Sequence, residues 1–157
     1  MRRRMIIEDK DIEPQSTLDE QQQMLNDTLV LLKPIRDHRY LKSQRQWRKE
    51  KQALRQIEQV YQQKQQQLAN QEQQQIDMRN KLDNQHKNKP ITQLTLQEWM
   101  AAERDLIIEI QTTQQALQTL QLNLTEQQQR VEHAQQAMTL QQKEVTKLDE
   151  MQRWIKE

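Results

Sequence analysis

The chain has 157 residues, of which 33% are hydrophobic and 3% aromatic, and it contains neither glycine nor cysteine. Without cysteine it has no disulfides or thiolate metal sites, and its formal net charge of +1 does not indicate a nucleic acid or a membrane surface as partner. Turns that need a positive φ usually rely on glycine, so few turns are expected. Together with the low aromatic content, this favours long helices over a large globular core.

Residues 1–16 are predicted to be irregular, because they are charged, contain Pro14 and show no sustained hydrophobic period. Thr17 and Glu20 match the T-x-x-E capping box, which predicts a short helix over about 18–33. Pro34 either kinks or ends this helix, or lies in the first turn of the next one, and the sequence leaves both open. Residues 1–33 are therefore expected to form an N-terminal extension to a second region, 34–157.

The segment 35–87 is predicted to form a long helix, because no helix breaker interrupts it after Pro34. Large side chains recur every seven residues along it, whereas the companion row (Arg36, Ser43, Glu50, Ile57, Lys64, Gln71, Met78) is mostly polar. The recurring row is Tyr40, Trp47, Leu54, Tyr61, Leu68, Gln75 and Leu82. This helix therefore has a weaker apolar stripe than the one that follows.

The segment 95–156 is predicted to form a second long helix, opened by a capping box at Thr95 and Glu98. Steps of alternately three and four residues visit mostly apolar positions from Leu96 to Ile155 without a slip, which is the 3.5-residue repeat of a coiled coil. Most remaining positions are Gln, Glu, Lys, Thr or Arg, and short glutamine tracts are expected on the solvated surface. So narrow a stripe needs a partner helix.

The residues 83–92 contain asparagines and Pro90 and are predicted to form a short turn between the two long helices. The two apolar stripes can then close on each other. The predicted fold is all-α: a long antiparallel two-helix coiled-coil hairpin with a short N-terminal helical extension. Because the stripes pair within one chain, a monomer is expected.

Candidate catalytic residues do not form a recognisable pattern. His38, His86 and His133 lie far apart, and neither a metal-binding motif nor a phosphate-binding glycine loop is present. A two-helix rod also has no water-excluding concave site. The sequence therefore predicts a protein that is not an enzyme and that binds no metal or cofactor.

Basic and aromatic residues are the candidates for partner binding. A run between Arg36 and Arg55 is predominantly basic, which fits a solvated helix face, a docking face for an acidic protein or, with less support, a nucleic-acid contact. Trp99 and Trp154 are either packed aromatics or interface anchors, and the sequence leaves both readings open. No apolar run approaches ~18 residues, and charged residues follow the N-terminal Ile pair directly, so a cytoplasmic protein is expected.

The stretch 31–39, Leu-Leu-Lys-Pro-Ile-Arg-Asp-His-Arg, resembles the L-x-x-I-R-x-x-R opening of bacterial type III secretion stalk proteins of the YscO/SpaM type. The opening of the second long helix, Leu96-Gln97-Glu98-Trp99, is similar to that of the flagellar export protein FliJ. Length, hairpin layout and composition match over roughly residues 30–157. This resemblance implies a cytosolic coiled coil whose paired termini insert into a hexameric export ATPase and whose surface contacts the cytoplasmic ring of the export gate.

The resemblance also implies site residues. Tyr61 and Trp99 match aromatics near the gate-contacting surface, with Leu106 and Ile110 further along the helix. The residues toward the ATPase are Arg36, Arg39, Arg45, Arg153 and Trp154. Some family members escort secretion chaperones, and contact with the membrane is expected only through partners. The alternatives that the sequence leaves open are a coiled-coil scaffold that dimerises through its stripes and a chaperone for a secreted substrate.

Overall fold

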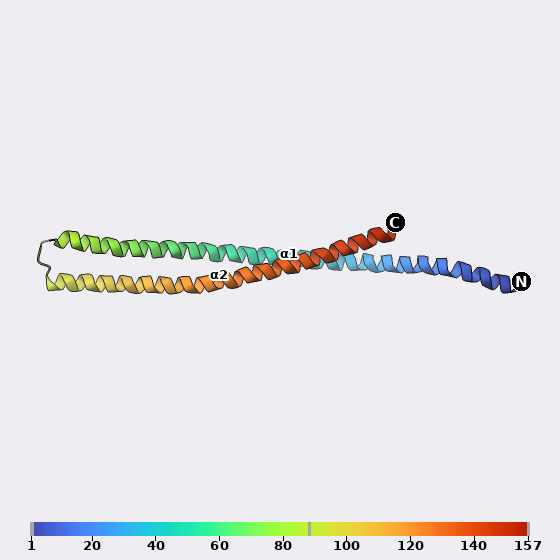
Figure 1. Ribbon diagram of the computed structural model, residues 1–157, viewed down its shortest axis with the longest axis horizontal. Coiled ribbons are helices and arrows are strands. Elements are labelled where there is room, and N and C mark those ends of the chain that lie inside the picture. The colour runs from blue at the N-terminus through green and yellow to red at the C-terminus, as the bar shows by residue number, and fades with distance from the viewer. Residues whose placement is uncertain (1, 88, 157) are drawn as a thin grey trace. The chain divides into compact units, whose positions relative to one another are not determined.

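The computed structural model describes the backbone of residues 2–87 and 89–156 and the side chains of 17–87 and 89–155. It has two helices, α1 (Arg2–His86) and α2 (Gln93–Lys156), joined by a short connection and packed antiparallel (Figure 1). The predicted all-α helical hairpin is confirmed. The expected arms, 35–87 and 95–156, end within a few residues of the observed helix ends, apart from the start of α1.

The core of the hairpin follows the predicted repeat on α2. Every predicted position from Trp99 to Ile155 is buried or half-buried, and Leu148 is only 1% exposed. Leu96 is the exception, because it lies in the first turn of α2, beside the end of α1. The 3.5-residue period therefore identifies the side of α2 that contacts α1.

The α1 side of the core is shallower. Both predicted rows, from Arg36 to Leu82, are half-buried, and the polar companion row lies against α2 together with the aromatic row. Among the described residues of α1 only Leu29 is fully buried. The weaker stripe that the sequence predicts for this helix corresponds to this partial burial.

The chain divides into two compact units. Unit 1 contains residues 1–49 and 132–157, and unit 2 contains residues 50–131. In unit 1, Arg36 donates a hydrogen bond to the Glu144 carbonyl (3.0 Å) and pairs with its carboxylate (3.5 Å). Lys33 lies 3.8 Å from the Asp149 carboxylate. These pairs join residues that advance in opposite directions along the chain, so they define the antiparallel register of unit 1.

In unit 2, the guanidinium of Arg79 contacts the Glu103 carboxylate at 2.8 Å, and Gln127 contacts Glu50. Each pair joins α1 to α2 through a polar side chain at or beside a core position. Polar contacts across a partly apolar interface favour one register over its neighbours, because a slip leaves buried polar groups without partners.

Pro34 was expected to kink or end a helix, or to lie in the first turn of the next one. It neither ends a helix nor begins a new one. α1 passes through it without interruption. Pro34 is exposed, so the Val30 carbonyl that lacks its N–H partner lies on the solvent side and can bind water. The core continues across Pro34, because buried Leu29 lies seven residues before core residue Arg36.

The start of α1 also differs from the prediction. Because α1 begins at Arg2, Thr17 and Glu20 lie inside the helix and do not cap its start. The irregular stretch predicted for residues 1–16 is wrong over 2–16, whose backbone belongs to α1, and residue 1 lies outside the described residues.

The start of α2 is capped one turn earlier than predicted. The Thr92 hydroxyl accepts a hydrogen bond from the Thr95 N–H at 3.2 Å, and the Leu96 N–H donates to the Thr92 carbonyl at 3.0 Å. Thr92 is thus the N-cap and Thr95 the third helical residue. The predicted box at Thr95 and Glu98 is wrong because Thr92, directly after Ile91, is already placed to satisfy the first free N–H groups.

Candidate functional site

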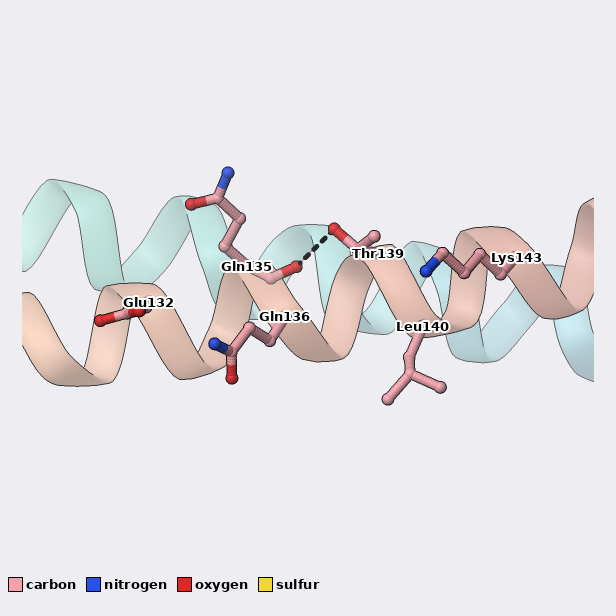
Figure 2. A pocket seen from close by; sticks show the side chains of 6 residues that line it. All are labelled: Glu132, Gln135, Gln136, Thr139, Leu140 and Lys143. Carbon is pink, nitrogen blue, oxygen red and sulfur yellow. Dashed lines mark hydrogen bonds between the residues drawn. The ribbon is translucent and has the colours of Figure 1, made fainter.

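The described surface offers open grooves. One of about 420 Å³ on the outer face of α2 is lined by residues of that helix alone, between Glu132 and Lys143 (Figure 2). Thr139 donates its hydroxyl hydrogen bond to the Gln135 carbonyl of its own helix, 2.9 Å away. The labelled side chains diverge from a single helix, so they do not converge on a bound molecule. This groove therefore gives no candidate for a small-molecule site.

Neither a metal-binding cluster nor a membrane-spanning helix is present among the described residues. Within the described part of the chain, no three His, Asp or Glu side chains gather closely enough to hold a metal ion. No described helix is long and apolar enough to cross a membrane.

Two of the residues predicted to contact an export gate are core residues. Leu106 and Ile110 are buried between α1 and α2. Tyr61 and Trp99 are half-buried at core positions, and the Trp99 indole Nε1 is buried without an acceptor among the described residues. Leu106 and Ile110 are therefore unavailable to a partner while the hairpin is closed, and Trp99 has the position of a packing residue.

The residues predicted to face an ATPase are more accessible. Arg39, Arg45 and Arg153 are exposed, and Trp154 is 85% exposed. Arg36 is the exception, because its guanidinium contacts Glu144 within the hairpin. Of the two tryptophans that the sequence left undecided, Trp154 lies in solvent and Trp99 in the core.

Unit 1 also exposes a set of large apolar side chains, which we call the apolar collar. Its members are Met24, Leu25, Val30, Leu31 and Ile35 on α1, and Met151 and Trp154 on α2. The Lys33–Asp149 pair places the two α2 members alongside the α1 members in the antiparallel register. Of these residues the sequence pointed only to Trp154 as a partner contact, because the others lie outside the heptad core and belong to no motif. The run 29–32, Leu-Val-Leu-Leu, is the sequence signal that could have shown the collar.

The collar residues of α1 lie at several angles around the helix. Relative to core residues Leu29 and Arg36, they lie on different outward rows, and Leu31 is 72% exposed. Large apolar side chains gathered on the surface of a helix commonly mark a protein interaction site, because water solvates such a patch poorly. The collar is thus the best candidate in unit 1 for a surface that a partner covers.

The fold defines the chain as a two-helix antiparallel hairpin of the coiled-coil kind. Comparison with protein-family models, curated proteins and solved structures found no match to this chain.

Proposed function

We propose that this chain is a non-enzymatic stalk of a bacterial type III secretion export apparatus. In this proposal the end of the hairpin that carries both termini enters the central hole of a hexameric export ATPase. The other end extends toward the cytoplasmic ring of the export gate. The protein acts in the cytoplasm as a mechanical and regulatory coupler without chemistry of its own.

The apolar collar is the observation that carries the proposal. Its side chains come from both helices and face several directions, so a flat partner would cover only part of it. A partner that encloses the hairpin, as a ring does, covers all of it and removes its apolar area from water at about 25 cal/mol per Å².

Exposed basic residues lie near the collar and indicate a second property of the partner, namely acidic groups. Arg39 follows the collar on α1, and Arg153 lies between its two α2 members. An enclosing partner with apolar and acidic groups on its inner wall complements this surface. The resemblance of residues 31–39 to the stalk proteins overlaps the collar at Leu31 and Ile35.

The proposal is tested with the export ATPase of the source organism, first identified by affinity capture of the tagged chain from lysate and mass spectrometry, and then purified. We expect the chain to co-elute with the ATPase hexamer and to raise its turnover. Leu31→Asp should weaken this binding by at least about tenfold. Leu122 in unit 2 is similarly exposed, so Leu122→Asp is the control and should bind like the wild type.

Two results would overturn the stalk proposal. The first is a wild-type chain that neither co-elutes with the ATPase nor changes its turnover. The second is an equal loss of binding in Leu31→Asp and Leu122→Asp. Capture of one secreted substrate alone would instead favour the chaperone alternative, and a stable dimer of this chain would favour the scaffold.

A further inference from the structure

The outward face of α2 in unit 2 carries a second apolar feature, opposite the core. Leu94, Ala101, Ile108 and Leu122 lie on one seven-residue row, interrupted only by Gln115. All of them are exposed, with Ile108 at 54%. The position farthest from the partner helix is normally polar in a two-helix coiled coil, so this row is not explained by the hairpin.

An acidic row runs directly beside the apolar one. Glu98, Asp105 and Glu126 each lie four residues after a position of the apolar row, and thus on the neighbouring strip of the helix surface. All three are exposed, and none of their carboxylates takes part in the ion pairs between residues 17 and 155.

The charge of this helix segment is strongly one-sided. Between residues 94 and 126 the acidic residues are Glu98, Glu103, Asp105, Glu109 and Glu126, and the only basic residue is Arg104. Glu103 is already paired with Arg79 on α1. The outward face therefore carries more negative than positive charge beside its apolar row, with Arg104 as the one basic residue between 94 and 126.

We propose that this face, the apolar row with its acidic neighbours, is a docking site for a basic amphipathic helix of a partner protein. The partner's apolar residues contact Leu94, Ile108 and Leu122, and its lysines or arginines lie against the acidic row. The row from Leu94 to Leu122 spans about 42 Å at 1.5 Å per residue, which suits a long helix laid along α2.

Charge selects this occupant over two others. A second copy docking through the same face would bring two acidic rows together, and like charges oppose such a contact. An anionic membrane surface is repelled by the same carboxylates.

The inference is independent of the proposed stalk function. The docking face belongs to unit 2 and the apolar collar to unit 1, and they share no residue. Leu122→Asp should weaken docking but not ATPase binding, and Leu31→Asp the reverse. Failure of one proposal is therefore distinguishable from failure of the other.

The test uses the full chain and a labelled synthetic helix of about 28 residues, with leucines spaced by three and four and lysines on both sides of them. A second peptide has glutamates in place of the lysines. Affinity is measured by fluorescence anisotropy at low and high salt. We expect the lysine peptide to bind, with an affinity that falls as salt is added, and the glutamate peptide not to bind.

Ile76 provides a matched control, because it is also an isoleucine of unit 2 and is 52% exposed, but on α1. Ile108→Ser should weaken binding of the lysine peptide at least about tenfold, and Ile76→Ser should leave it unchanged. Both variants should melt like the wild type, because neither side chain is in the core. Replacement of Glu98, Asp105 and Glu126 by lysine should transfer binding to the glutamate peptide.

Any of three results would overturn the docking site: no binding of the lysine peptide to the wild type, equal binding of both peptides, or equal weakening by Ile108→Ser and Ile76→Ser. Survival of lysine-peptide binding after the triple charge reversal would show that the acidic row is not the contact, and it would overturn the choice of a basic helix.

Discussion

The side-chain amide of Gln127 on α2 donates a hydrogen bond to the backbone carbonyl of Glu50 on α1, 3.0 Å away, from a buried core position. The same amide also contacts the Glu50 carboxylate. A single glutamine thus satisfies two acceptors across the helix interface, at a place where a coiled coil would ordinarily have an apolar contact. The hairpin gains register specificity there and loses apolar burial.

Gln127→Ala should therefore lower the free energy of unfolding by about 1–3 kcal/mol, because half-buried Glu50 loses a donor. Replacing both residues by leucine should recover most of this loss, since apolar pairs of similar size fit the interface. Urea denaturation followed by circular dichroism at 222 nm measures both. A double variant as unstable as the single one would contradict this account.

Leu148 is the most buried side chain of the described hairpin, at 1% exposure. Leu148→Ala should cost about 2–5 kcal/mol through lost burial and the cavity it leaves. Leu140, about two turns earlier on the same helix, is 60% exposed, and Leu140→Ala should change stability by less than about 0.5 kcal/mol. Thermal melts of the two variants check the difference, and similar melting temperatures would refute the burial pattern.

Pro34 lies in the interior of α1 and faces solvent. Pro34→Ala should raise the free energy of unfolding by about 1–3 kcal/mol, because alanine restores the N–H that can bond to the Val30 carbonyl. Ile35 is the next residue and is also exposed, so Ile35→Ala serves as the control. It should change the free energy of unfolding, measured in denaturant, only slightly. A destabilised Pro34→Ala variant would mean that the proline supports the helix geometry here.

Arg79 and Lys33 form ion pairs in different surroundings. The Glu103 side chain paired with Arg79 is 14% exposed, whereas the Lys33 and Asp149 side chains are 48% and 43% exposed. Arg79→Ala should cost about 1–3 kcal/mol by leaving a mostly buried carboxylate without its partner, and Lys33→Ala about 0–1 kcal/mol. Adding Glu103→Leu to Arg79→Ala should restore stability in urea unfolding, and no rescue would exclude the buried carboxylate as the cause.

Leu117 tests whether the helices pair within one chain. It is half-buried at a core position of α2, so Leu117→Asp should lower helicity and melting temperature. The sedimenting mass should stay that of one 19.2 kDa chain in both wild type and variant. A wild type of twice this mass that falls to one chain in the variant would show pairing between chains instead.

The heptad pattern was enough to predict the hairpin and the side of each helix that faces the other. A 3.5-residue period maintained from Trp99 to Ile155 places those positions on one side of any helix, and their side chains have only the other helix to pack against. This holds even for polar members such as Gln127, which is buried because its position in the seven-residue repeat faces the other helix.

Accessibility and helix ends were decided by the tertiary structure. The same heptad position that made Leu106 and Ile110 recognisable also buries them, so they cannot be surface contacts while α1 covers them. Trp154 is exposed because its side chain lies off the core row, and a local capping motif at Thr95 could not reveal that Thr92 already caps α2. The hydrophobic period is a property of one helix, so the sequence of that helix predicts it. The exposure of a side chain depends on what packs against the helix, and the sequence of one segment cannot predict that.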